Sequence, residues 1–255
     1  MPRKKENNNS SDEKVKITQK LIHYLPCSVS QTREKGWDIT RTYEWGEVRS
    51  FAIETININD LFILIAITKA FQDYNPFVKE GEVREDKPTL ALKLGFWSFA
   101  KYYLGSHDEG AIKKSLQRLI SWKVIFIQKK GDVNPQEYLV DFKIFEEEGV
   151  KKVIFVLNKH FYNACINRGL LLNFDALKAI KSNLTKALFI YLEGTSAKSF
   201  YQQTLERVLN MDRTDMKPFT RRAKIKEAFE ILKNHLLIQG YQCEKKEQGY
   251  LFSYQ

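Results

Sequence analysis

Cysteine is scarce in this sequence. The 255 residues contain three cysteines, Cys27, Cys165 and Cys243, which are odd in number and far apart. No CxxC motif and no Cys/His cluster with metal-ligand spacing occurs, so a disulfide framework and a zinc site are both excluded. Isolated thiols are typical of a reducing compartment, and we therefore expect a cytoplasmic protein without a metal or another cofactor.

Long apolar segments are also missing. The longest uninterrupted apolar run, Leu61 to Ile67, has seven residues, whereas a membrane-spanning helix needs roughly 20. The first residues, MPRKKENNNSSDEK, are polar and lack the hydrophobic core of a signal peptide. We expect neither a membrane span nor export.

Catalytic motifs are absent as well. A P-loop needs GxxxxGK followed by Ser or Thr, and the nearest candidate, Gly105–Gly110, is followed by Ala-Ile. Neither GxSxG nor HExxH occurs. The histidines are scattered singly, unlike the paired metal ligands of a rolling-circle nicking enzyme; they are His23, His107, His160 and His235. We expect a protein without catalytic residues.

Positive charge is abundant, and it is unevenly distributed. The chain has 41 Lys and Arg against 31 Asp and Glu, a formal net charge of +10. Residues 1–20 carry a net +3 and residues 158–255 a net +7, whereas residues 21–157 are balanced. Such asymmetry favours a polyanionic partner, most often a nucleic acid.

The apolar pattern predicts an ordered body behind a short tail. Residues 1–20 are rich in Asn, Ser and Lys and are expected to form a disordered basic tail. Beyond them, alternating and helical periodicities predict a mixture of helices and strands. The expected helices include 59–74, 109–121, 175–193, 203–211 and 219–234, and the expected strands include 124–128, 137–145, 151–157, 236–243 and 250–254.

A repeat within this pattern indicates the architecture. Four apolar positions of the first half recur in the second at a constant offset of 113 residues: Ile112, Leu116, Leu119 and Val124 match Ile225, Phe229, Leu232 and Leu237. Each set is preceded by a short helix and followed by a basic turn, the order of a winged helix-turn-helix. We therefore predict an α+β protein with two tandem winged helix-turn-helix domains, the first at 21–157 with an N-terminal extension and the second at 158–255.

The second copy holds the stronger candidate for a DNA-recognition helix, residues 219–229. Its N-terminal end is crowded with cations, which suits contact with phosphates and base edges. The candidate DNA-binding residues are Thr220, Arg221, Arg222, Lys224 and Lys226 on the helix, Lys217 just before it, and Lys245 and Lys246 in the predicted wing. The sequence leaves open whether Arg221 or Arg222 reads a base.

The first copy is a weaker candidate. Its long helix offers Lys113, Lys114, Gln117 and Arg118, and its predicted wing turn offers Lys129 and Lys130. The start of that helix is acidic, which repels phosphate. The first copy is expected either to contact DNA lightly or to pair with another protomer.

Over roughly residues 50–255 the chain resembles the plasmid replication initiator (Rep) family, whose members have two winged helices in tandem. The segments that carry the resemblance are INDLFILIAI, SFAKYYLG followed by IKKSLQRLISWKVIFI, then LLLNFDALKAIKSNLTKALFIYLEG and RRAKIKEAFEILKNHLLIQGY.

This resemblance implies a protein that binds direct repeats (iterons) in double-stranded origin DNA and recruits the host initiator and replicative helicase. It leaves the homodimer open, since many such initiators repress their own gene as dimers while monomers bind iterons. Two other functions fit the same pattern: a winged-helix transcriptional regulator and a helicase-loading adaptor.

Overall fold

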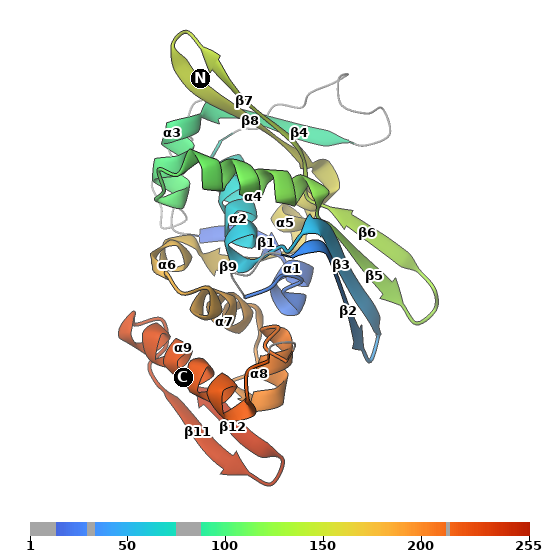
Figure 1. Cartoon of the computed structure of the whole chain (residues 1–255), viewed down its shortest axis with the longest axis vertical. Coiled ribbons are helices and arrows are strands. Elements are labelled where there is room, and N and C mark those ends of the chain that lie inside the picture. The colour runs from blue at the N-terminus through green and yellow to red at the C-terminus, as the bar shows by residue number, and fades with distance from the viewer. Residues whose placement is uncertain (1–13, 30–33, 75–87, 213–214) are drawn as a thin grey trace.

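The computed structural model describes residues 14–29, 34–74, 88–212 and 215–255 (Figure 1). Two groups of elements in this chain have the same arrangement, and we call them the first and second winged units. The first comprises α2 (Ile58–Asp73), β4 (Thr89–Gly95), α3 (Phe96–Phe99), η1 (Ala100–Leu104), α4 (Glu109–Ser121), β7 (Leu139–Glu147) and β8 (Val150–Asn158). The second comprises α7 (Asn183–Gly194), β10 (Ser199–Tyr201), α8 (Gln202–Val208), α9 (Pro218–Asn234), β11 (Tyr241–Lys246) and β12 (Gly249–Tyr254).

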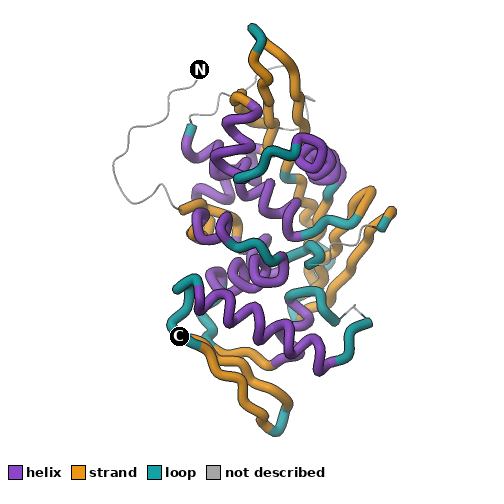
Figure 2. Tube along the Cα trace, turned by 60° about the vertical axis from the view of Figure 1, so that its left-hand side comes forward, coloured by secondary structure: helices purple, strands orange, loops and turns teal. Residues whose placement is uncertain are grey.

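Both units build the same three-stranded antiparallel sheet. Its order is β4-β8-β7 in the first unit and β10-β12-β11 in the second, so in each the first strand pairs with the last. The hairpins β7–β8 and β11–β12 project at opposite ends of the molecule (Figures 1 and 2). The fold class predicted from the sequence, α+β with tandem winged helices, is thereby confirmed.

The first helix of each unit is apolar and buried. In α2, thirteen of sixteen residues are buried, because Leu, Ile and Phe occupy nearly every side of the helix. The helix starts at a capping box, in which the Asn57 side chain accepts from the N–H of Asp60 and the Asp60 carboxylate accepts from the N–H of Asn57. The register of α2 is therefore determined locally.

A second sheet is inserted into the first winged unit. It has the order β2-β3-β5-β6 and is made by β2 (Lys35–Tyr43), β3 (Gly46–Glu54), β5 (Lys123–Gln128) and β6 (Val133–Glu137). The turn with Lys129 and Lys130 closes the β5–β6 hairpin of this sheet, whereas the wing is the β7–β8 hairpin. The placement of Lys129 and Lys130 in the wing was wrong, because β5 pairs with β3 rather than with β4 or β8.

The N-terminal segment is more ordered than expected. Strand β1 (Lys14–Thr18) pairs antiparallel with β9 (Gly169–Asn173), and α1 (Gln19–Tyr24) follows it. Val15 and Ile17 of β1 are buried, so the expectation of disorder was wrong for residues 14–20. Residues 1–13 lie outside the described part of the chain.

The β1–β9 pair also bears on the domain division. The helices α5 (Lys159–Arg168) and α6 (Phe174–Ala179) flank β9, and α5 packs against β1 and β8. The sequence assigned residues 158–173 to the second domain, yet they pair and pack with N-terminal elements. The boundary between residues 157 and 158 remains a prediction.

The core explains the repeated spacing. Ile112, Leu116 and Leu119 of α4 are buried, as are their counterparts Ile225, Phe229 and Leu232 of α9. The fourth pair is not equivalent: Val124 lies in β5, while Leu237 lies in the loop between α9 and β11. Three of the four positions thus mark a shared helix face.

Candidate DNA interface

Helix α9 presents one face to the core and the other to solvent. Phe229 stacks on Tyr241 and Phe252 of the wing strands, with ring centroids 5.1 and 5.6 Å apart. Pro218 occupies the first turn, where its missing N–H costs nothing. The predicted residues Lys217, Thr220, Lys224 and Lys226 are all exposed, and three of these four side chains are cationic.

The two neighbouring arginines of α9 lie in different environments. Arg221 is only 15% exposed, and its Nε lies 3.3 Å from a carboxylate oxygen of Glu206 in α8. Its Nη1 donates to the Met211 carbonyl at 3.2 Å. Arg221 therefore ties the two helices of the helix-turn-helix together.

Arg222 instead faces the wing. Its guanidinium lies 3.7 Å from the ring centroid of Tyr250 in β12 and 5.4 Å from that of Phe219. Burial raises the pKa of Cys243 on β11, while the charges of Lys226 and Arg222 act in the opposite direction. Both cations therefore lie beside the wing, and the structure brings helix and wing residues to one place.

The wing itself carries the last two predicted cations. Lys245 is exposed at the end of β11. Lys246 is also exposed, but its Nζ lies 2.6 Å from a carboxylate oxygen of Glu244. This ion pair within the strand already offsets the positive charge of Lys246. Lys245 is thus the freer of the two to attract an anion.

The outward face of α9 also carries acid, which the sequence analysis did not weigh. Glu227 and Glu230 are exposed in the second half of the helix. Burial, together with the hydrogen bond that Tyr241 donates to Glu230, raises the pKa of Tyr241 to about 12. The excess of positive charge therefore lies in the first half of α9, since Lys233 is the cation that accompanies these two acids in the second half.

The first unit presents fewer unpaired cations. Lys114 and Gln117 are exposed on α4. Lys113 lies 2.8 Å from Glu109, which also pairs with Lys151 of β8 at 2.6 Å. Hydrogen bonds from Lys113 and Lys151 lower the pKa of Glu109, so this carboxylate stays ionised and offsets both charges.

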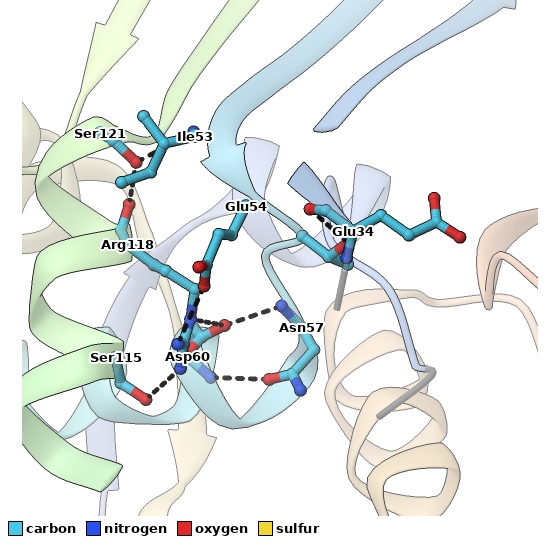
Figure 3. Close-up of polar contacts among 9 residues, drawn as sticks. Glu34, Ile53, Glu54, Asn57, Asp60, Ser115, Arg118 and Ser121 are labelled. Atoms are coloured by element: carbon cyan, nitrogen blue, oxygen red, sulfur yellow. Dashed lines mark hydrogen bonds and ion pairs between the residues drawn. The ribbon is translucent and has the colours of Figure 1, made fainter. Parts of the chain in front are cut away.

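The expectation that Arg118 is offered to DNA was wrong, because its side chain is buried and paired with Asp60. The sequence analysis missed the ionic cluster that these residues form between α2 and α4 (Figure 3). Asp60 is fully buried, and Nη2 of Arg118 lies 2.8 Å from it. Arg118 also donates to Ser115 at 2.9 Å and lies 3.6 Å from Glu54. The Asn57–Asp60 capping box was the only local signal, since 58 residues separate the two charges.

A second polar cluster joins the inserted sheet to the second unit. Arg41 of β2 donates to the Asn210 side chain and to the Tyr24 carbonyl, and Asn210 donates to the Cys27 carbonyl. Arg207 of α8 donates to the Thr42 carbonyl, with its guanidinium 5.2 Å from the ring centroid of Tyr43. Arg41, Thr42 and Cys27 thus hold the turn after α8.

No helix of the described residues is both long and apolar enough to cross a membrane. No group of three or more His, Cys, Asp or Glu side chains among them is arranged to hold a metal ion.

These features define a tandem winged-helix protein whose helix α9 presents an exposed cationic surface. Solved structures with the same fold are domains 2 and 3 of RctB: one has a TM-score of 0.60 at 12% identity, covering 93% of this chain and 98% of that one. Another, RctB residues 155–483, has a TM-score of 0.54 at 11% identity, covering 90% of this chain and 94% of that one.

The sequence comparisons found no relative. No protein-family model matches the chain, and no curated protein matches it. The resemblance to Rep-type proteins is confirmed at the level of the fold, which is that of domains 2 and 3 of RctB.

Proposed function

We propose that this protein is a plasmid replication initiator that binds direct repeats (iterons) in duplex DNA at the origin and recruits the host initiator and replicative helicase. It acts without catalysis of its own. The observation that carries the proposal is the exposed, cationic first half of α9, presented beside a wing in a tandem winged-helix fold. The likeness of that fold to RctB supports it.

The contacts of the second unit suggest a division of roles. Lys217, Lys224, Lys226 and Lys245 are exposed and suit phosphates, since Lys acts as a point charge. Arg222 is held by the wing at the start of α9 and suits the O6 and N7 of a guanine. Arg221, with its buried partner Glu206, positions the helix.

The first unit makes the weaker contact with DNA in this proposal. Lys114 and Gln117 would contact the other half of a repeat, while Glu109 offsets the charge of Lys113. Lys129 and Lys130 would reach DNA only from the turn of the inserted sheet.

The decisive experiment is fluorescence anisotropy of the full-length chain on labelled duplexes from the DNA flanking its gene, against scrambled duplexes at several salt concentrations. We expect a preference of about 10³ for repeated sites and a log–log salt slope of about −0.9 per neutralised phosphate. A palindromic site bound by a two-fold dimer would favour a transcriptional regulator. Weak binding that ignores both sequence and salt would favour a helicase-loading adaptor.

A further inference from the structure

Helix α9 begins with an aromatic side chain that the fold leaves in solvent. Phe219, the second residue of the helix, is 70% exposed. Burying a phenylalanine is strongly favourable, so exposure at this place needs a reason other than folding. The neighbouring residues Lys217 and Thr220 are exposed too, and the cation of Arg222 lies against the ring, so the ring stands beside positive charge rather than in an apolar surface.

The ring nevertheless has a contact on one side. The Arg222 guanidinium lies 5.4 Å from its centroid and 3.7 Å from that of Tyr250. A chain of contacts therefore runs from the wing through Arg222 to the first turn of α9. A side chain with such a contact loses less conformational entropy when it meets a ligand.

Duplex DNA offers one apolar group to a helix in the major groove, the C5-methyl of thymine, and phenylalanine is among the side chains that contact it. We propose that Phe219 is a specificity-determining residue that reads thymine through this methyl group. Arg222, in contact with the same ring, would address the guanine next to that thymine. The inference rests on the proposed function and refines it.

The test separates the methyl group from every hydrogen bond. In vitro selection from random duplexes first defines a site for the full-length chain. Each thymine of that site is then replaced by deoxyuridine, which lacks only the methyl, and affinities are measured for the wild type, Phe219→Ala and Phe219→Leu. Leu236→Ala is the matched control, because Leu236 is an exposed apolar residue just beyond the opposite end of α9.

For the wild type and Leu236→Ala we expect about a fourfold loss of affinity at one or two thymines, the value of one buried methyl. For Phe219→Ala the thymine and deoxyuridine sites should bind equally, with Phe219→Leu between. The inference is overturned if no deoxyuridine weakens the wild type, or if Phe219→Ala keeps the wild-type ratio. A wild type that selects no site at all would instead overturn the proposed function.

Discussion

Asp60 and Arg118 form a buried ion pair between α2 and α4, and losing either side chain should destabilise the fold. Removing one partner of a buried ion pair leaves an uncompensated charge and costs about 3–5 kcal/mol. Arg118→Met should therefore lower the free energy of unfolding by about that amount, measured by urea denaturation, because Asp60 is fully buried. Lys114→Met, on the exposed face of the same helix, should change it by less than about 0.5 kcal/mol. Equal effects of the two variants would contradict a structural role for the pair.

The burial of the cysteine thiols leads to a second prediction at the scale of the residue. Burial raises the pKa of Cys27 and Cys165 to about 12, and only the thiolate is nucleophilic. At pH 8 both buried thiols are therefore almost entirely protonated and should be inert to a thiol reagent in the native protein. Cys243 is half-buried and should react first, and all three should react in urea. Rapid reaction of three thiols in the native state would contradict this.

At the scale of the element, α9 serves the fold on one side and DNA on the other. Arg221→Ala should destabilise the protein by about 1–3 kcal/mol, because it leaves the buried Glu206 without its cation. Lys224→Ala should leave the melting temperature unchanged but weaken DNA binding at every sequence and reduce the salt slope by about 1. Thermal melts of both variants measure the effect on stability, and salt titrations measure the effect on DNA binding. A Lys224→Ala variant with a lower melting temperature and unchanged DNA binding would contradict this division of roles.

The two basic hairpin turns allow a matched comparison. Lys245→Ala/Lys246→Ala and Lys129→Ala/Lys130→Ala remove the same charge, the first from the wing beside α9 and the second from the inserted sheet. We expect the larger loss of DNA affinity, measured by anisotropy, from the wing variant. The opposite order would mean that DNA runs along the inserted sheet.

At the scale of the whole molecule, the Arg41–Asn210 contact joins the inserted sheet to the turn after α8 in the second unit. Arg41→Met should lower the free energy of unfolding by about 1–3 kcal/mol, because the side-chain oxygen of Asn210 and the Tyr24 carbonyl lose their donor. Hydrogen exchange should then rise in β2 and in the turn after α8. Arg49→Met, which removes an exposed pair with Asp38 on the same sheet, should cost at most about 1 kcal/mol and leave that exchange unchanged.

Much of the architecture could be read from local patterns. The apolar α2, the buried face of α4 and the matching face of α9 follow from side chains three and four residues apart, which any helix brings together. The 113-residue offset between Ile112 and Ile225 then indicated two copies of one fold. The cationic start of α9 is likewise a property of adjacent residues.

Which strands pair and which side chains contact one another was decided only by the tertiary structure. Lys129 and Lys130 lie outside the wing because β5 pairs with β3, some 75 residues earlier in the chain, and nothing in a strand's own sequence specifies its neighbour. Arg221 and Arg222 are adjacent and alike, yet one meets Glu206 and the other Tyr250, since successive helix positions face different directions. The sequence by itself determined which segments are helices with apolar faces, because that information is local. Which charge is buried, which arginine faces the wing and which hairpin is the wing depend on segments that meet only when the chain packs.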